Sequence, residues 1–182
     1  MAGDARDSGA GRRVKRVVIT GSESTGKTTL ARRLGEHFGV PVSPEFVRGY
    51  AAERGNKLGF NDHGAIARGQ MAGEDAAIAR AGDIAIHDTD LVSTVVYCEH
   101  YFGMCPDWIR EEASKRRADL YLLLAPDVPW EPDGIRDREG QRDELHAAFT
   151  RALAAIGATV VEIRGDRDAR FQAAVSAIRP RA

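Results

Sequence analysis

Short apolar runs alternate with amphipathic helical patterns along most of the chain. The runs are typical of strands buried on both faces, and they lie at residues 14–20, 40–43, 83–88, 120–125 and 159–163. Between them, apolar residues recur at helical spacing, as in Leu30, Leu34 and Phe38. Residues 91–101 fit either a strand, because they are rich in β-branched side chains, or a helix. The alternation predicts an α/β fold of three layers with a parallel sheet of about five strands.

A glycine-rich stretch joins the first predicted strand to the first predicted helix. Its sequence at 21–28, Gly-Ser-Glu-Ser-Thr-Gly-Lys-Thr, fills every position of the phosphate-loop motif of P-loop NTPases. Lys27 is expected to reach the β- and γ-phosphates of ATP, and the Thr28 hydroxyl to bind Mg²⁺. The predicted ATP-binding residues of this stretch are Gly21, Glu23, Ser24, Thr25, Gly26, Lys27, Thr28 and Thr29.

Acidic residues stand where two other predicted strands end. Asp88 closes the third strand as a Walker B carboxylate does, and we expect it to hold Mg²⁺ together with Thr28. Asp90 and Glu45 are the candidates for the general base that faces an acceptor hydroxyl. Arg48 follows Glu45 by one helical turn and is expected to pair with it or to bind substrate. Because ligands bind at the carboxyl ends of parallel strands, these residues are predicted to converge on one edge of the sheet.

Residues 126–140 read as a polar, proline-containing loop. Arg136 and Arg138 are expected to close over the phosphates of ATP, with Arg136 as an arginine finger. Trp130 is the better candidate for stacking on a flat ring. Tyr50 and Phe46 are aromatic candidates too, but their helical spacing favours a place in the core.

Charge and cysteine usage exclude several classes of protein. The chain has 26 basic and 27 acidic residues, a net charge of −1, which predicts no nucleic-acid partner. It shows neither a membrane-spanning run nor a signal peptide, so we expect a cytoplasmic protein with no membrane partner. Cys98 and Cys105 are expected to be reduced thiols rather than zinc ligands. We predict a flexible tail over 1–13 and one kinase domain over 14–182, with a homo-oligomer left open.

Several stretches together resemble one known family. They are the loop from Gly21 to Leu30, Glu-Phe-Val-Arg-Gly-Tyr at 45–50, Ile-His-Asp-Thr-Asp at 86–90, Asp-Leu-Tyr-Leu-Leu-Leu at 119–124, and Pro-Trp-Glu-Pro-Asp-Gly-Ile-Arg at 129–136. Their order and spacing are similar to the ribosylnicotinamide kinase domain of bacterial bifunctional NAD-biosynthesis and regulatory proteins. The likeness runs from about Arg16 to the C-terminus.

The resemblance implies an adenylate-kinase-like fold with a short lid, and phosphorylation of the 5′-hydroxyl of nicotinamide riboside by ATP, giving NMN and ADP. It implies that Lys27 and Thr28 serve ATP and Mg²⁺ and that Asp88 and Asp90 lie at the active site. It also implies a substrate-contacting lid that contains Trp130, Asp133 and Arg136.

Two departures from the family affect this expectation. The chain has no nucleotidyltransferase or DNA-binding domain, so those activities are not expected. Pro44 precedes Glu45 where the family has an aromatic residue, so another small ribosyl or hydroxyl substrate is an alternative. A nucleoside or nucleoside-monophosphate kinase is the closest rival, and a non-catalytic ATP-binding switch ranks lower. A loop rich in Asp and Arg rather than exposed apolar residues favours a kinase over a docking switch.

Overall fold

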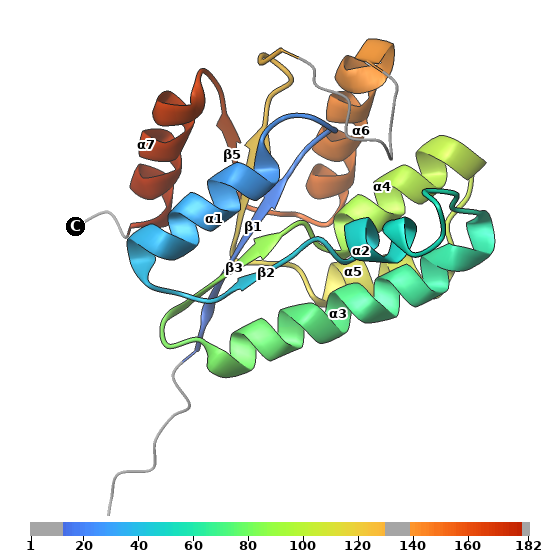
Figure 1. Ribbon diagram of the computed structural model, residues 1–182, viewed down its shortest axis with the longest axis horizontal. Coiled ribbons are helices and arrows are strands. Elements are labelled where there is room, and N and C mark those ends of the chain that lie inside the picture. Colours follow the sequence, from blue (N-terminus) through green and yellow to red (C-terminus); the bar gives the residue numbers. More distant parts are fainter. Residues whose placement is uncertain (1–12, 130–138, 180–182) are drawn as a thin grey trace, which may run out of the picture.

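A computed structural model describes residues 13–129 and 139–179 of the chain. Its five strands form one parallel sheet in the order β2-β3-β1-β4-β5 (Figure 1). The strands are β1 (Lys15–Thr20), β2 (Val42–Ser43), β3 (Ile84–Asp88), β4 (Leu120–Leu124) and β5 (Val160–Ile163). The central strand β1 pairs Ile19 with Asp88 of β3 and Thr20 with Leu123 of β4. The strand ends therefore lie along one edge, as predicted.

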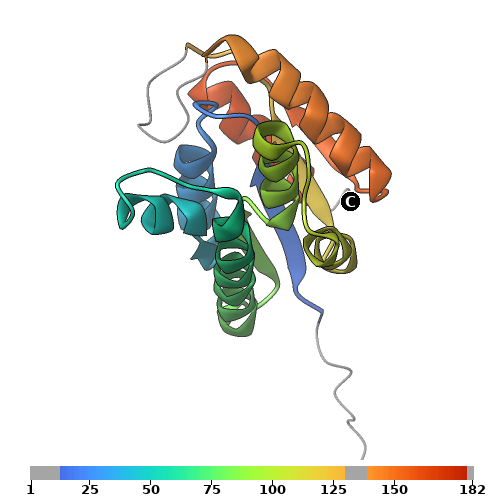
Figure 2. The ribbon, with the colours of Figure 1, turned by 90° about the vertical axis from the view of Figure 1, so that its right-hand side faces the viewer.

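Helices cover both faces of this sheet (Figures 1 and 2). One face carries α1 (Lys27–Phe38) and α7 (Arg167–Ile178), and the other carries α3 (His63–Arg80), α4 (Leu91–Phe102), α5 (Asp107–Lys115) and α6 (Arg142–Ala155). Alternate side chains of β1 serve the two cores: Val17 and Ile19 pack with α1 and α7, and Val18 packs with the opposite layer. This confirms the predicted three-layer α/β fold.

The ambiguous segment after β3 is a helix, α4. Its residues from Leu91 through Cys98 are all buried. No polar face appears in that part of the sequence, which is why periodicity could not separate a helix from a strand. The helix ends at Gly103, whose φ of 69° suits glycine. Phe102, the last residue of α4, is 38% exposed.

A short helix, α2 (Phe46–Ala52), packs on α3 outside the sheet (Figure 2). Only Ala51 of α2 is buried, and Phe46 is 37% exposed. The prediction that Phe46 is a core residue was therefore wrong. Its ring lies on Gly69 of α3, where an added Cβ would come within 2.2 Å of the ring. The helices approach each other here because Gly69 has no side chain.

Asp62, the residue before α3, does not cap that helix with its side chain. The carboxylate instead accepts a hydrogen bond from the Tyr50 hydroxyl at 2.9 Å and one from the Gly59 N–H at 2.8 Å. It thereby stabilises the 3₁₀ turn η1 (Phe60–Asp62). A second 3₁₀ turn, η2 (Glu139–Gln141), precedes α6.

The two cysteines are buried, free thiols. Burial raises the pKa of both thiols, and that of Cys105 reaches about 12. No helix in residues 13–129 and 139–179 is both long enough and apolar enough to cross a membrane.

Candidate active site

The phosphate loop connects β1 to α1 at the carboxyl edge of the sheet. Gly21 has a φ of 136°, and a Cβ there would lie 2.8 Å from the carbonyl oxygen of Leu124, so only glycine allows this approach to β4. Gly26 is the N-cap of α1, with a φ of 83° and no side-chain cap. An anion at this place would lie at the N-terminus of α1, where the helix dipole favours negative charge.

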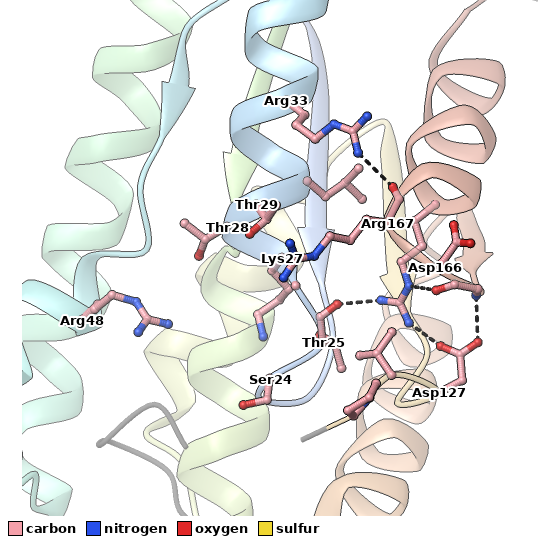
Figure 3. A pocket seen from close by; sticks show the side chains of 16 residues that line it. Ser24, Thr25, Lys27, Thr28, Thr29, Arg33, Arg48, Asp127, Asp166 and Arg167 are labelled. Carbon is pink, nitrogen blue, oxygen red and sulfur yellow. Dashed lines mark hydrogen bonds and ion pairs between the residues drawn. The ribbon is translucent and has the colours of Figure 1, made fainter. Parts of the chain in front are cut away.

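Side chains of the loop hold its curved backbone. Thr25 Oγ1 donates to the Ser22 carbonyl oxygen at 2.9 Å, and Lys27 Nζ donates to the same oxygen at 2.7 Å. Lys27 is 7% exposed and lies inside the loop (Figure 3). Glu23 is buried as well, so its predicted contribution to ATP binding would come from its backbone rather than its carboxylate.

Thr28 and Asp88, the two predicted magnesium ligands, are in contact. Thr28 Oγ1 donates a 2.6 Å hydrogen bond to Asp88 Oδ2. Asp88 Oδ1 is buried without a hydrogen-bond partner in the described part of the chain. A buried carboxylate oxygen that lacks a donor, beside a hydroxyl, is the oxygen set that Mg²⁺ prefers. The residues present therefore fit the cation.

The environment of Asp88 disfavours its charge when no cation is present. Burial, and secondly the charge of Glu45, raise the pKa of Asp88 to about 6. The hydrogen bond from Thr28 and the charge of Lys27 act in the opposite direction. A divalent cation beside Asp88 would supply the positive charge that stabilises its ionised carboxylate.

Glu45 and Arg48 form an ion pair next to this carboxylate. Arg48 Nη2 lies 3.2 Å from Glu45 Oε2. The Glu45 side chain is buried, and its residue forms the N-cap position of α2. The Arg48 side chain is 47% exposed and directs its guanidinium toward the phosphate loop (Figure 3). Of the two roles predicted for Arg48, pairing with Glu45 is therefore observed, and binding of substrate stays a prediction.

Asp90 is placed differently from the other candidate acids. Its carboxylate caps α4 by accepting from the Val92 N–H at 3.0 Å, and it accepts from the Tyr121 hydroxyl at 2.7 Å. It is 4% exposed. Burial raises the pKa of Asp90, while the hydrogen bonds from Tyr121 and Val92 oppose that rise. Both oxygens are thus engaged in the core, and the position favours a structural role over that of a base.

Tyr50 is also engaged within the protein. Its hydroxyl donates to Asp62, and the guanidinium of Arg54 lies 3.7 Å from the centre of its ring. Its predicted role as a substrate contact stays a prediction.

A cavity of about 860 Å³ extends from the phosphate loop toward β5 (Figure 3). Of the predicted ATP-binding residues, 24–29 line it, whereas Gly21 and Glu23 do not. Arg48 lies on one side, and Asp127, Asp166 and Arg167 lie on the other. Thr28 also lines a second cavity, of about 540 Å³, together with Asp88 and Pro44.

Arg170 is a residue of the site that the sequence did not indicate. From α7 its guanidinium donates to the carbonyl oxygens of Thr25 at 2.6 Å, Ala125 at 2.8 Å and Gly165 at 2.7 Å. It also pairs with Asp127. It is 4% exposed. One buried cation thus joins the phosphate loop to the loops that follow β4 and β5.

Four predicted residues lie outside the described part of the chain: Trp130, Asp133, Arg136 and Arg138. Their proposed roles in stacking and in closing over the phosphates remain predictions.

Residues 16–170 match the AAA domain family. The chain belongs to this family. The trifunctional NAD biosynthesis/regulator protein NadR of Escherichia coli is 30% identical to it over 173 residues, which cover 91% of this chain and 42% of that protein. The chain thus spans less than half of this relative.

Two solved structures of NadR proteins are similar to this fold. One, in complex with NR, has a TM-score of 0.81 and 30% identity, and the match covers 91% of this chain and 50% of that chain. The other, in complex with NAD and AMP-PNP, has a TM-score of 0.79 and 29% identity, and it covers 91% of this chain and 48% of that chain. The resemblance predicted from the sequence is confirmed.

Proposed function

We propose that this chain is an ATP-dependent kinase that phosphorylates the 5′-hydroxyl of nicotinamide riboside and releases NMN and ADP. The observation that carries the proposal is the meeting of two carboxylates at one edge of the sheet: Asp88, bonded to the loop residue Thr28, and Glu45, close enough to raise the pKa of Asp88. A complex of a related NadR protein with NR supports the acceptor, and one with AMP-PNP supports ATP as the donor.

The donor side binds and neutralises the triphosphate. The N–H groups of the loop and the start of α1 face the phosphates, and Lys27 moves from the Ser22 carbonyl to the β- and γ-phosphates. Thr28 and Asp88 would hold Mg²⁺, which supplies positive charge to the β- and γ-phosphate oxygens when it is bound.

The acceptor side supplies the base. The oxygen of the acceptor hydroxyl attacks the γ-phosphorus, its proton passes to the Glu45 carboxylate, and the bond from the γ-phosphorus to the β–γ bridging oxygen breaks. Arg48 orients that carboxylate through its 3.2 Å contact. The structural engagement of Asp90 makes Glu45 the stronger of the two candidate bases.

The test is ADP release from Mg·ATP with and without nicotinamide riboside, with the product mass determined. Strong stimulation and formation of NMN are the expected results. Stimulation by a nucleoside or a nucleoside monophosphate instead would show that the proposed acceptor is wrong and that the proposed kinase activity is right. Slow hydrolysis that no acceptor stimulates would overturn the kinase and favour an ATP-binding switch.

A further inference from the structure

Gln70, on α3, contacts three separate parts of the chain with one side-chain amide. Its Oε1 accepts from the Phe46 N–H at 3.1 Å, and its Nε2 donates to the Thr89 carbonyl oxygen at 3.1 Å and to Glu74 Oε1 at 3.4 Å. The side chain is nearly inaccessible, with the residue 4% exposed. An amide offers one acceptor oxygen and two N–H donors, and all of these functions are used.

The first contact supplies a cap that α2 otherwise lacks. Phe46 is the first residue of α2, and the N-cap residue Glu45 makes no side-chain cap to it. Gln70 therefore satisfies an N–H that the helix cannot satisfy itself. The adjacent Gly69 allows the Phe46 ring to lie against α3 at the same place. The start of α2, and with it Glu45, is fixed to α3.

The second contact holds a strained turn. Thr89 has a φ of 66°, a left-handed conformation that a β-branched residue rarely adopts. Its N–H donates to the Ile19 carbonyl oxygen at 3.0 Å, and its carbonyl oxygen accepts from Gln70. Thr89 directly follows Asp88, so the conformation of this turn sets where the Asp88 carboxylate points.

The third contact orients the amide. Glu74 is 1% exposed, and its Oε2 lies 3.3 Å from Arg16 Nη2 and 3.4 Å from Arg116 Nη2. Held by two arginines, Glu74 presents its other oxygen to Gln70, which directs the amide nitrogen toward Glu74 and Thr89 and the amide oxygen toward Phe46.

We propose that Gln70 is a positioning residue that fixes the proposed base Glu45 relative to Asp88. The two carboxylates stand at the ends of neighbouring strands: Glu45 lies two residues after β2, and Asp88 is the last residue of β3. The two strands are paired at Ser43 and His87. β2 has only two residues, so strand pairing alone holds the following segment weakly. Gln70 joins the segment after β2 to the turn after β3. This inference rests on the proposed phosphoryl transfer.

The test compares Gln70→Met, which keeps the length and loses all three hydrogen bonds, with Gln172→Met, the same change at an exposed position of α7. Each protein is assayed with whichever acceptor the wild type phosphorylates. For Gln70→Met we expect a kcat lower by about 10- to 100-fold, an unchanged dissociation constant for ATP, and more ATP hydrolysed per product formed. Hydrogen exchange at the Phe46 amide should become faster.

A wild-type kcat and wild-type coupling of hydrolysis to transfer in Gln70→Met would overturn the inference. So would a lower melting temperature alone, because a structural role would not alter that coupling. If Gln70→Met does not fold, the same assays are made on Gln70→Asn, whose side chain is one methylene shorter.

A rescue experiment adds a second readout. Glycine takes a positive φ without strain, so Thr89→Gly in the Gln70→Met background should recover part of the lost kcat. A wild type that phosphorylates no acceptor would refute the proposed function instead, and the Phe46 exchange rate would still report on the contact.

Discussion

The Thr28 hydroxyl donates a hydrogen bond to the Asp88 carboxylate over 2.6 Å, although 60 positions separate the two residues in the chain. Thr28 lies in the first turn of α1, and Asp88 ends β3. They meet because β1, which leads into α1, is paired in parallel with β3. The contact buries a carboxylate whose second oxygen lacks a donor in the described structure. Burial of the ionised carboxylate therefore destabilises the folded protein, and a bound cation would offset this destabilisation.

Asp88→Asn is expected to stabilise the protein in the absence of Mg²⁺ and nucleotide. The folded state raises the pKa of Asp88 from 3.8 to about 6, so protonated Asp88 contributes stability below pH 4 that is lost as the pH rises through 6. Asparagine removes this loss. We expect the free energy of unfolding at pH 8 to rise by up to about 3 kcal/mol, with no gain at pH 4. Urea denaturation at both values measures it.

The same variant should lose its response to Mg²⁺. At pH 8 the cation stabilises the wild type by binding the ionised Asp88, and this increment should be absent in Asp88→Asn. An identical pH dependence in the two proteins would show that Asp88 titrates normally.

Lys27→Ala is expected to abolish transfer by removing the charge that faces the phosphates. We expect kcat to fall by about a hundredfold or more, measured by ADP release with the acceptor present. Lys115→Ala, at an exposed position of α5, is the control. Full activity in Lys27→Ala would refute the assignment of the whole site.

Arg170→Met should weaken both the fold and the ATP site. The change leaves the carbonyl oxygens of Thr25, Ala125 and Gly165 without their buried donor. We expect a loss of about 3 kcal/mol in the free energy of unfolding and a higher KM for ATP. Arg151→Met, on the exposed side of α6, should change neither quantity. A variant with unaltered KM would limit Arg170 to a structural role.

Substitutions at two glycines of α3, Gly69 and Gly73, test the packing of α2 on α3, with Gly73 as the control. A Cβ at Gly69 would lie 2.2 Å from the Phe46 ring, whereas a Cβ at Gly73 would meet nothing within 4 Å. Gly73→Ala should stabilise the protein by about 0.5–1 kcal/mol, because alanine favours the helix. Gly69→Ala should instead destabilise it by about 1–3 kcal/mol. Thermal unfolding of both variants measures the difference, and equal effects would mean that α2 does not pack there.

The sequence predicted what local patterns encode. Five strands and the phosphate loop were each recognisable from an apolar run or a motif, and helical spacing indicated pairing with Glu45 as one of two roles for Arg48. The contact of Thr28 with Asp88 followed from parallel topology, because strand ends of one sheet must share an edge.

Residues whose partners are distant in the chain escaped prediction. Arg170 reads as an ordinary arginine of an amphipathic helix, and nothing near it indicates Thr25 or Ala125, its partners in space. Asp90 followed an apolar strand as a catalytic acid would, and its engagement in the core depends in part on Tyr121, 31 positions further along the chain. The exposure of Phe46 depends on Gly69, 23 positions further along the chain.

The residues proposed to bind ATP and those proposed to bind the acceptor come from different parts of the chain. The donor loop leaves β1 at the centre of the sheet, while Glu45, Arg48 and the helices α2 and α3 all come from one continuous insertion between β2, an edge strand, and β3. An exchange of this insertion would leave the loop and the central strands in place. Evolution, or a protein engineer, could therefore give this scaffold a new acceptor by replacing most of a single segment of about 40 residues, 44–83, if the contact of Gln70 with the turn after Asp88 is kept.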